Sequence, residues 1–203
     1  MPTLLFGILL FFAPEIFQNL PNLSEGSRID AFGFQFPLTW GLLLLIFNFT
    51  FLIPSYLIYL LYKFGTIKSL KMETLADRQK PFILTTLVYT LATLFFFFKM
   101  RQLPEISLMM IGITMSIALV TVISLSWQIS AHGTGIGGML GSVMALLVKT
   151  GAAGLFWPML GLLATAGFLM SARLQLNAHT PKQIIAGLSL GFGISAGLVM
   201  IWF

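Results

Sequence analysis

The most reactive side chains of this sequence lie in three short polar segments. The first, 68–80, combines lysines, an arginine and two carboxylates, the second, 127–133, contains His132, and the third, 173–183, contains His179. These are the only two histidines of the chain. Imidazoles beside cationic side chains can act on a bound anion, one as a nucleophile and the other as a general acid.

The charge balance around the histidines is one-sided. From Ile106 to the end of the chain there is no Asp or Glu, whereas Arg173 and Lys182 remain. Arg offers a planar fork of donors that matches phosphate oxygens. Ser130 and Thr180-Pro181 also precede apolar runs as helix caps would, and helix N-termini favour anions. These features predict an anion site, with phosphate as the best match.

Other kinds of site fit the same residues less well. A zinc site usually needs three or four ligands, so the two histidines would need Glu73 or Asp77, whose spacing does not support this. A Ser-His-Asp triad lacks a carboxylate after either histidine, and the absence of cysteine excludes thiolate chemistry. We therefore predict no metal and no cofactor. The residues alone leave open that each histidine merely caps a helix or forms hydrogen bonds at the membrane surface.

The elements that position these residues must be membrane helices. The 203 residues are 58% hydrophobic and 8% charged, and their mean hydropathy is +0.97. Soluble domains carry about a quarter charged residues, so lipid must surround most of this chain. The basic residues stand in short loops and form no stripe of the kind that binds nucleic acid, so no nucleic-acid partner is expected.

The apolar runs predict an all-α transmembrane bundle of six or seven spans that forms a single domain over residues 1–203. A helix needs about 20 apolar residues to cross a bilayer. The expected spans are 2–19, 39–63, 82–100, 106–127, 135–149, 152–171 and 182–203.

The order of the spans places the three polar segments together. Two spans separate the first segment from the second, and two more separate the second from the third. Because an even number of crossings returns the chain to the same face, all three segments should meet at one membrane surface. The loop 18–38 is the longest and is expected to be a cap or lid.

Two sets of glycines recur at four-residue spacing. One set is Gly133, Gly137 and Gly141, and the other is Gly193 and Gly197. Small residues at this spacing let membrane helices approach closely. We expect both sets to lie at helix–helix contacts.

At this point the motifs resemble those of the type 2 phosphatidic acid phosphatase superfamily, written K-x6-R-P, P-S-G-H and S-R-x5-H-x3-D. The resemblance covers about 71–190. It rests on Lys71 and Arg78, Ser130-Ala131-His132, and Arg173 with His179. The chain departs from the pattern at Pro81, Ile129 and Ala172, and most notably at Gln183, where the family has Asp.

The resemblance implies a role for each matching residue. His179 would be the nucleophile and His132 the general acid, with the phosphate oxygens bound by Lys71, Arg78, Ser130 and Arg173. The orienting group of His179 would be Gln183. A carboxylate on the same face, Glu73 or Asp77, is a second hypothesis for that role.

The function implied is metal-independent hydrolysis of a phosphomonoester or pyrophosphate on a membrane lipid. Candidate substrates are phosphatidic acid, phosphatidylglycerol phosphate and a polyprenyl pyrophosphate. One alternative is a lipid-phosphate-binding protein with little or no activity, which Gln183 favours. A small transporter is less favoured because no repeated halves are found. The sequence does not predict the oligomeric state.

The two indications of sidedness disagree. The family resemblance implies the cytoplasmic membrane of a bacterium with the active face toward the periplasm. The positive-inside rule favours the cytoplasm for the same face, because most Lys and Arg residues lie there. Basic residues that bind phosphate are a weak topology signal, so the periplasmic side is the expectation.

Overall fold

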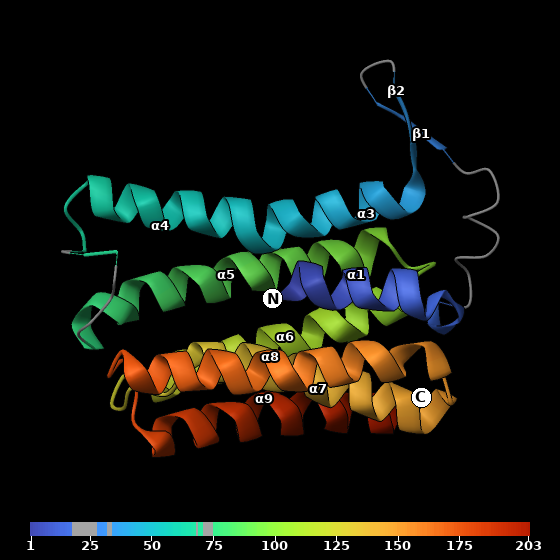
Figure 1. Ribbon diagram of the computed structural model, residues 1–203. Coiled ribbons are helices and arrows are strands. Elements are labelled where there is room, and N and C mark those ends of the chain that lie inside the picture. Colours follow the sequence, from blue (N-terminus) through green and yellow to red (C-terminus); the bar gives the residue numbers. More distant parts are fainter. Residues whose placement is uncertain (18–27, 32–33, 68, 71–74) are drawn as a thin grey trace.

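The computed structural model of the protein describes residues 1–17, 28–31, 34–67, 69–70 and 75–203. Its helices run alongside one another as a bundle (Figure 1). Six of them are long and apolar enough to cross a membrane: Leu38–Lys63, Asp77–Lys99, Pro104–Ile123, Ala131–Thr150, Ala153–Gln175 and Pro181–Trp202. The prediction of an all-α, polytopic membrane protein is confirmed.

The elements are named as in Figure 1. The α-helices are α1 (Pro2–Phe12), α3 (Leu38–Phe47), α4 (Ile53–Lys63), α5 (Leu75–Lys99), α6 (Pro104–Ile123), α7 (Ala131–Thr150), α8 (Phe156–Gln175) and α9 (Pro181–Trp202). A π-helix, Asn48–Leu52, joins α3 to α4, and short 3-10 helices occur at Pro14–Ile16 and Ala153–Leu155. A hairpin is formed by the antiparallel strands β1 (Arg28–Ala31) and β2 (Phe34–Pro37).

Several predicted spans have different bounds: α5 begins seven residues before the expected 82, α6 ends four residues before the expected 127, and α8 ends four residues after the expected 171. The first and fifth spans differ in ways that matter for the site. The first, expected over 2–19, ends at Phe12 and is too short to cross a bilayer, because Pro14 begins a separate 3-10 turn. The fifth, expected over 135–149, begins at Ala131 and has a full 20 residues. Its first turns are rich in glycine and therefore low in hydropathy, but the Ser130 cap starts the helix there.

The hairpin of β1 and β2 lies beside the start of α3. This is the opposite end of the bundle from the ends of α4 and α8, where the three polar segments lie (Figure 1). The prediction that the 18–38 loop caps the site is therefore wrong for its described part. The alternation Phe34, Phe36 explains the local preference for strand over helix.

Helices α7 and α9 are in backbone contact. A Cβ added at Gly141 would lie 2.5 Å from the carbonyl oxygen of Phe192, and one at Gly187 would lie 2.5 Å from that of Ser130. A Cβ at Gly137 or Gly191 would come still closer to the partner helix, at Leu188 and Thr134, whereas one at Gly133 would lie 3.1 Å from the carbonyl oxygen of Ile184. The first glycine set thus packs as predicted.

The second glycine set does not. A Cβ added at Gly193 or Gly197 would meet nothing within 4 Å, so the prediction is wrong for these two. The contact on α9 is made instead by Gly187 and Gly191. Both pairs have the same spacing, but only one faces α7.

Helices α5 and α6 are held differently, by pairs of threonine hydroxyls. Thr86 and Thr121 share a hydrogen bond of 2.7 Å, and Thr93 and Thr114 share another of 2.7 Å. In hydrocarbon such bonds average about 0.6 kcal/mol each by double-mutant cycle. The two levels of contact fix the register of α5 against α6.

Candidate active site

Four helix ends bring the predicted site residues to one end of the bundle. Helices α5, α7 and α9 all begin there, and α8 ends there (Figure 1). Arg78 lies in the first turns of α5, His132 is the second residue of α7, and Arg173 lies in the last turn of α8. His179 is in the loop that joins α8 to α9. This is the convergence that the even number of crossings predicts.

These four side chains form one electrostatic cluster, called here the cationic cluster: Arg78, His132, Arg173 and His179. Each interacts electrostatically with each of the other three. The guanidinium of Arg78 is 8% exposed and His179 is 7% exposed, whereas His132 is exposed. The Nε of Arg173 is buried and has no hydrogen-bond partner among the described residues.

The cluster lies at the positive ends of three helix dipoles. The first amides of α5, α7 and α9 point toward this end, and each helix N-terminus carries a partial positive charge. The backbone amide of Ser130 donates to the backbone carbonyl oxygen of Gln183 at 3.2 Å, and this bond joins the starts of α7 and α9 directly. Cations gathered at helix N-termini repel one another, so an anion bound here would relieve the repulsion.

His179 is held by the first turn of α9. Its Nδ1 lies 3.2 Å from Oε1 of Gln183, and the amide of Thr180 donates to the same oxygen at 3.0 Å. The backbone amide of Gln183 in turn donates to the Thr180 hydroxyl at 3.4 Å. Gln183 therefore completes a capping box and holds the imidazole with one oxygen atom.

The contact with Gln183 favours a proton on the Nδ1 of His179. A backbone N–H can only donate, so the atom of the Gln183 side chain that the Thr180 amide contacts must be the oxygen Oε1 and not the nitrogen. An oxygen that only accepts requires a proton on the Nδ1 of His179. In the neutral imidazole the Nε2 then carries the lone pair, as a nucleophile needs.

The surroundings of His179 lower its pKa below the ordinary histidine value. Burial is the largest cause, and the positive charges of Arg78 and Arg173 act in the same direction. Hydrogen bonds to Gln183 and to the backbone of Gln128 oppose the shift in part. The imidazole is therefore neutral at neutral pH. The contact with Gln128 is one that the sequence gave no means to predict.

Ser130 also has a structural role. It is fully buried, its hydroxyl oxygen accepts from the backbone amide of Gly133 at 3.1 Å, and its own backbone amide donates to the backbone carbonyl of Gln183. These bonds do not use the hydrogen of the hydroxyl, so the expected contact with phosphate stays a prediction. Ser130 caps α7 and fixes the position of the neighbouring His132.

The carboxylates near the cluster are few. Of the Asp and Glu residues whose backbone is described, only Asp77 lies at this end, in the first turn of α5. Lys71 and Glu73 lie outside the described residues, so their expected roles stay predictions. Within the described part of the chain, no three His, Asp or Glu side chains come together as a metal site would require.

The arrangement can bind a tetrahedral anion and place a neutral imidazole against it. The comparisons with known proteins add no further information, since no family model, curated protein or solved structure matches this chain.

Proposed function

We propose that the protein is a membrane lipid phosphatase that hydrolyses a lipid phosphomonoester or pyrophosphate through a phosphohistidine intermediate. The observation that carries the proposal is the cationic cluster, in which two imidazoles and two guanidiniums converge at three helix N-termini. The resemblance of the sequence motifs to the type 2 phosphatidic acid phosphatases supports the same reaction.

Binding of the phosphate group follows from the charges. Arg78 and Arg173 donate to its oxygens, and the buried Nε of Arg173 supplies a donor that has no described partner in the protein. Lys71 adds a third cation in this proposal. The helix N-termini stabilise the charge that develops on these oxygens during the reaction.

The reaction proceeds in two steps. The Nε2 of His179 attacks phosphorus, and the bond from phosphorus to the leaving oxygen breaks as His132 gives that oxygen a proton. Water then attacks the phosphohistidine, His132 takes a proton from this water, and the N–P bond breaks to release inorganic phosphate. Gln183 keeps the Nδ1 proton in place throughout and so keeps Nε2 aimed at phosphorus.

The membrane location is part of the proposal. We place the protein in the cytoplasmic membrane of a bacterium with the cationic cluster facing the periplasm, as the resemblance implies. By the order of the spans in the sequence, most lysines and arginines fall on this side of the membrane, which by itself favours the cytoplasmic side. Several of them have a role in binding phosphate in this proposal, so they carry little information on topology.

The test is phosphate release by the purified protein in detergent with EDTA present. The substrates are phosphatidic acid, phosphatidylglycerol phosphate and a polyprenyl pyrophosphate. Wild type should release phosphate from at least one of them, and His179→Ala should release none. Lys149→Ala is the matched control, because Lys149 is exposed in the last turn of α7, at the opposite end of that helix from His132, and is expected to leave release unchanged.

A second candidate is a protein that binds lipid phosphates without hydrolysing them. Gln183 favours it, because an amide cannot stabilise the imidazolium by charge as an orienting carboxylate does. No release from any of the three lipids, by folded protein that still binds them, would decide for this second candidate.

A further inference from the structure

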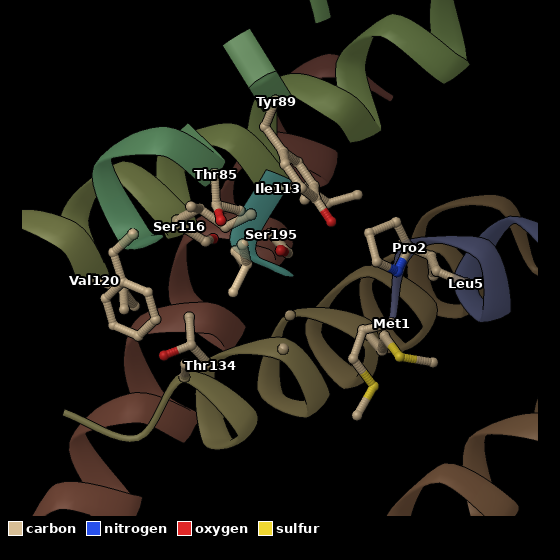
Figure 2. A pocket seen from close by; sticks show the side chains of 17 residues that line it. Met1, Pro2, Leu5, Thr85, Tyr89, Ile113, Ser116, Val120, Thr134 and Ser195 are labelled. Atoms are coloured by element: carbon tan, nitrogen blue, oxygen red, sulfur yellow. The ribbon is translucent and has the colours of Figure 1, made fainter. Parts of the chain in front are cut away.

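An apolar pocket of about 270 Å³ lies within the bundle next to the cationic cluster. Helices α1, α4, α5, α6, α7 and α9 contribute to its walls. Figure 2 shows Thr85 and Tyr89 of α5, Ser116 of α6 and Thr134 of α7 around it, with Met1 of α1 at one side. Residues far apart in the sequence thus form this pocket.

Four serine and threonine side chains line the pocket, and all but Ser195 of α9 have hydroxyls bonded to the backbone. Thr85 donates to the carbonyl oxygen of Pro81, Ser116 to that of Gly112, and Thr134 to that of Ser130, each within its own helix or cap. Hydroxyls that are already bonded to the backbone present mainly carbon to the pocket. A hydrocarbon is therefore a better occupant than a sugar or a nucleotide.

The hydroxyl of Tyr89 has a backbone partner for a specific reason. Pro54 has no N–H, so the carbonyl oxygen of Thr50, four residues earlier, lacks its helical donor. The Tyr89 hydroxyl donates to this oxygen at 2.7 Å. The phenol hydroxyl is thereby hydrogen-bonded inside the membrane, although Tyr89 lines the pocket.

The pocket begins beside the cationic cluster. Ala131, which lines it, precedes His132 directly, and Phe82, which also lines it, is one helical turn after Arg78 on α5. From this mouth the pocket extends along α7 as far as Met139. Eight residues of helix correspond to a depth of about 12 Å, close to the roughly 15 Å of one leaflet.

The far end of the pocket is enclosed by the protein core. Leu5 and Met139 are 2% exposed, and Tyr89 is 5% exposed. The mouth, by contrast, is formed by half-buried residues such as Phe82 and Ala131, and Met1 at one side of the pocket is 44% exposed. An apolar chain that enters at the mouth therefore meets a closed end after about one leaflet.

We propose that this pocket binds one hydrocarbon chain of the lipid whose phosphate group occupies the cationic cluster, and that its closed end limits the chain to acyl length. The inference rests on the proposed function for the identity of the phosphate-bearing lipid. Among the candidate substrates it selects the acyl lipids over the polyprenyl pyrophosphate. A second acyl chain, where the lipid has one, stays in the bilayer.

The test uses two probes that carry an uncleavable P–C bond, hexylphosphonate and hexadecylphosphonate. Ile113 lines the pocket on the closed side, and Ile117 lies one turn nearer the mouth on α6. Ile113→Phe fills the closed end and Ile117→Phe fills the middle. Met115→Phe is the matched control, because Met115 is on the same helix, is 45% exposed and does not line the pocket.

Binding is measured by calorimetry in one detergent, so that partition of the probes into micelles cancels between variants. Ile113→Phe should weaken hexadecylphosphonate about tenfold, the loss expected when roughly two methylenes no longer enter the pocket. It should leave the affinity for hexylphosphonate unchanged. Met115→Phe should leave the affinities for both probes unchanged. Ile117→Phe should weaken the binding of hexadecylphosphonate more than Ile113→Phe does. If Ile113→Phe does not fold, Ile117→Phe still tests the inference.

The outcomes separate this inference from the proposed function. Equal affinity of wild type, Ile113→Phe and Ile117→Phe for hexadecylphosphonate would overturn the chain-binding role of the pocket, even if phosphate release is intact. Preferential release from a polyprenyl pyrophosphate would overturn the acyl-length limit. Length-dependent binding that responds to both variants would support the inference even if no lipid is hydrolysed, in which case only the proposed function fails.

Discussion

The two main helix pairs of the bundle, α7–α9 and α5–α6, are held together by opposite means. The α7–α9 pair is in backbone contact through glycines such as Gly141 and Gly187. The α5–α6 pair is spaced by side chains and joined by threonine hydroxyls, as between Thr86 and Thr121. The first contact has no side-chain rotamers to adjust, whereas the second depends on two rotatable hydroxyls at each level.

This difference matches the tasks that we propose for the two pairs. Both histidines lie at the start of the α7–α9 pair, where backbone contact and the bond from Ser130 to Gln183 fix their spacing. The α5–α6 pair supplies much of the wall of the apolar pocket. A reaction needs a fixed geometry within fractions of an ångström, whereas a hydrocarbon chain is recognised by volume alone.

The largest expected effect is at the catalytic end of the α7–α9 pair. His132→Gln removes the proposed general acid, so release from an alkyl phosphate should fall about 10²- to 10⁴-fold. Release from an aryl phosphate should fall much less, because a phenolate leaves without a proton. The values of kcat/KM on the two substrates check this, because kcat/KM reports the formation of the phosphohistidine and not its later hydrolysis, in which His132 also takes part. An equal fall on both would show that His132 has another role, such as binding.

The next effect concerns the backbone contact itself. Gly191→Val would force a side chain against the carbonyl oxygen of Thr134 and the amide of Gly138, whereas Gly193→Val meets open space. Overpacking of this kind costs about 1–3 kcal/mol, so the first variant should melt at a lower temperature than wild type. Gly193→Val should melt close to wild type. Thermal unfolding in detergent is the measurement, and equal melting of the two variants would contradict the packing described here.

The same two positions show what a sequence can and cannot predict here. Four-residue spacing marks a small-residue face on a helix, and Gly193 and Gly197 share it with Gly187 and Gly191. Which face meets a neighbour depends on the orientation of α9 in the bundle, which no local pattern contains. In contrast, the sequence could predict that the polar segments meet at one end of the bundle, because this follows from counting the spans between them.

The site was predictable to a similar extent. Charge and spacing identified the cationic cluster, but the capping role of Ser130 depends on α7 beginning at Ala131, four residues earlier than hydropathy predicts. The apolar pocket left no signal in the sequence, because its walls come from six helices and each contributes ordinary apolar residues. Contacts between distant residues, such as that of His179 with the backbone of Gln128, are likewise set by the fold.

A smaller effect tests how the α7–α9 pair tunes His179. Gln183→Glu keeps an oxygen for Thr180 and so keeps the capping box, but it places a negative charge beside the imidazole. This charge should raise the pKa of His179 above its value in wild type. The nucleophile is the neutral form, and it is lost as pH falls through the pKa.

The acid limb of the pH profile of kcat/KM should therefore lie at higher pH in Gln183→Glu than in wild type. Near neutral pH the variant should lose activity as more of the imidazole is protonated, and at alkaline pH it should recover. Thermal stability is the control, because an intact capping box should leave the melting temperature near that of wild type. An unshifted acid limb would show that Gln183 does not contact the catalytic histidine during the reaction.

The smallest effect is expected in the α5–α6 pair, where each hydroxyl bond is weak. A double-mutant cycle on Thr86→Val and Thr121→Val should give a coupling of about 0.6 kcal/mol, the average for such pairs in hydrocarbon. Valine keeps the shape of threonine, so the cycle isolates the 2.7 Å hydrogen bond between the two hydroxyls. Unfolding free energies in a fixed detergent supply the four corners. Because Thr121 also bonds to its own helix at Ile117, a coupling near zero would mean that this local bond suffices. The α5–α6 pair would then be held by apolar packing. The two helix pairs would differ only in how closely the two helices of each pair approach one another.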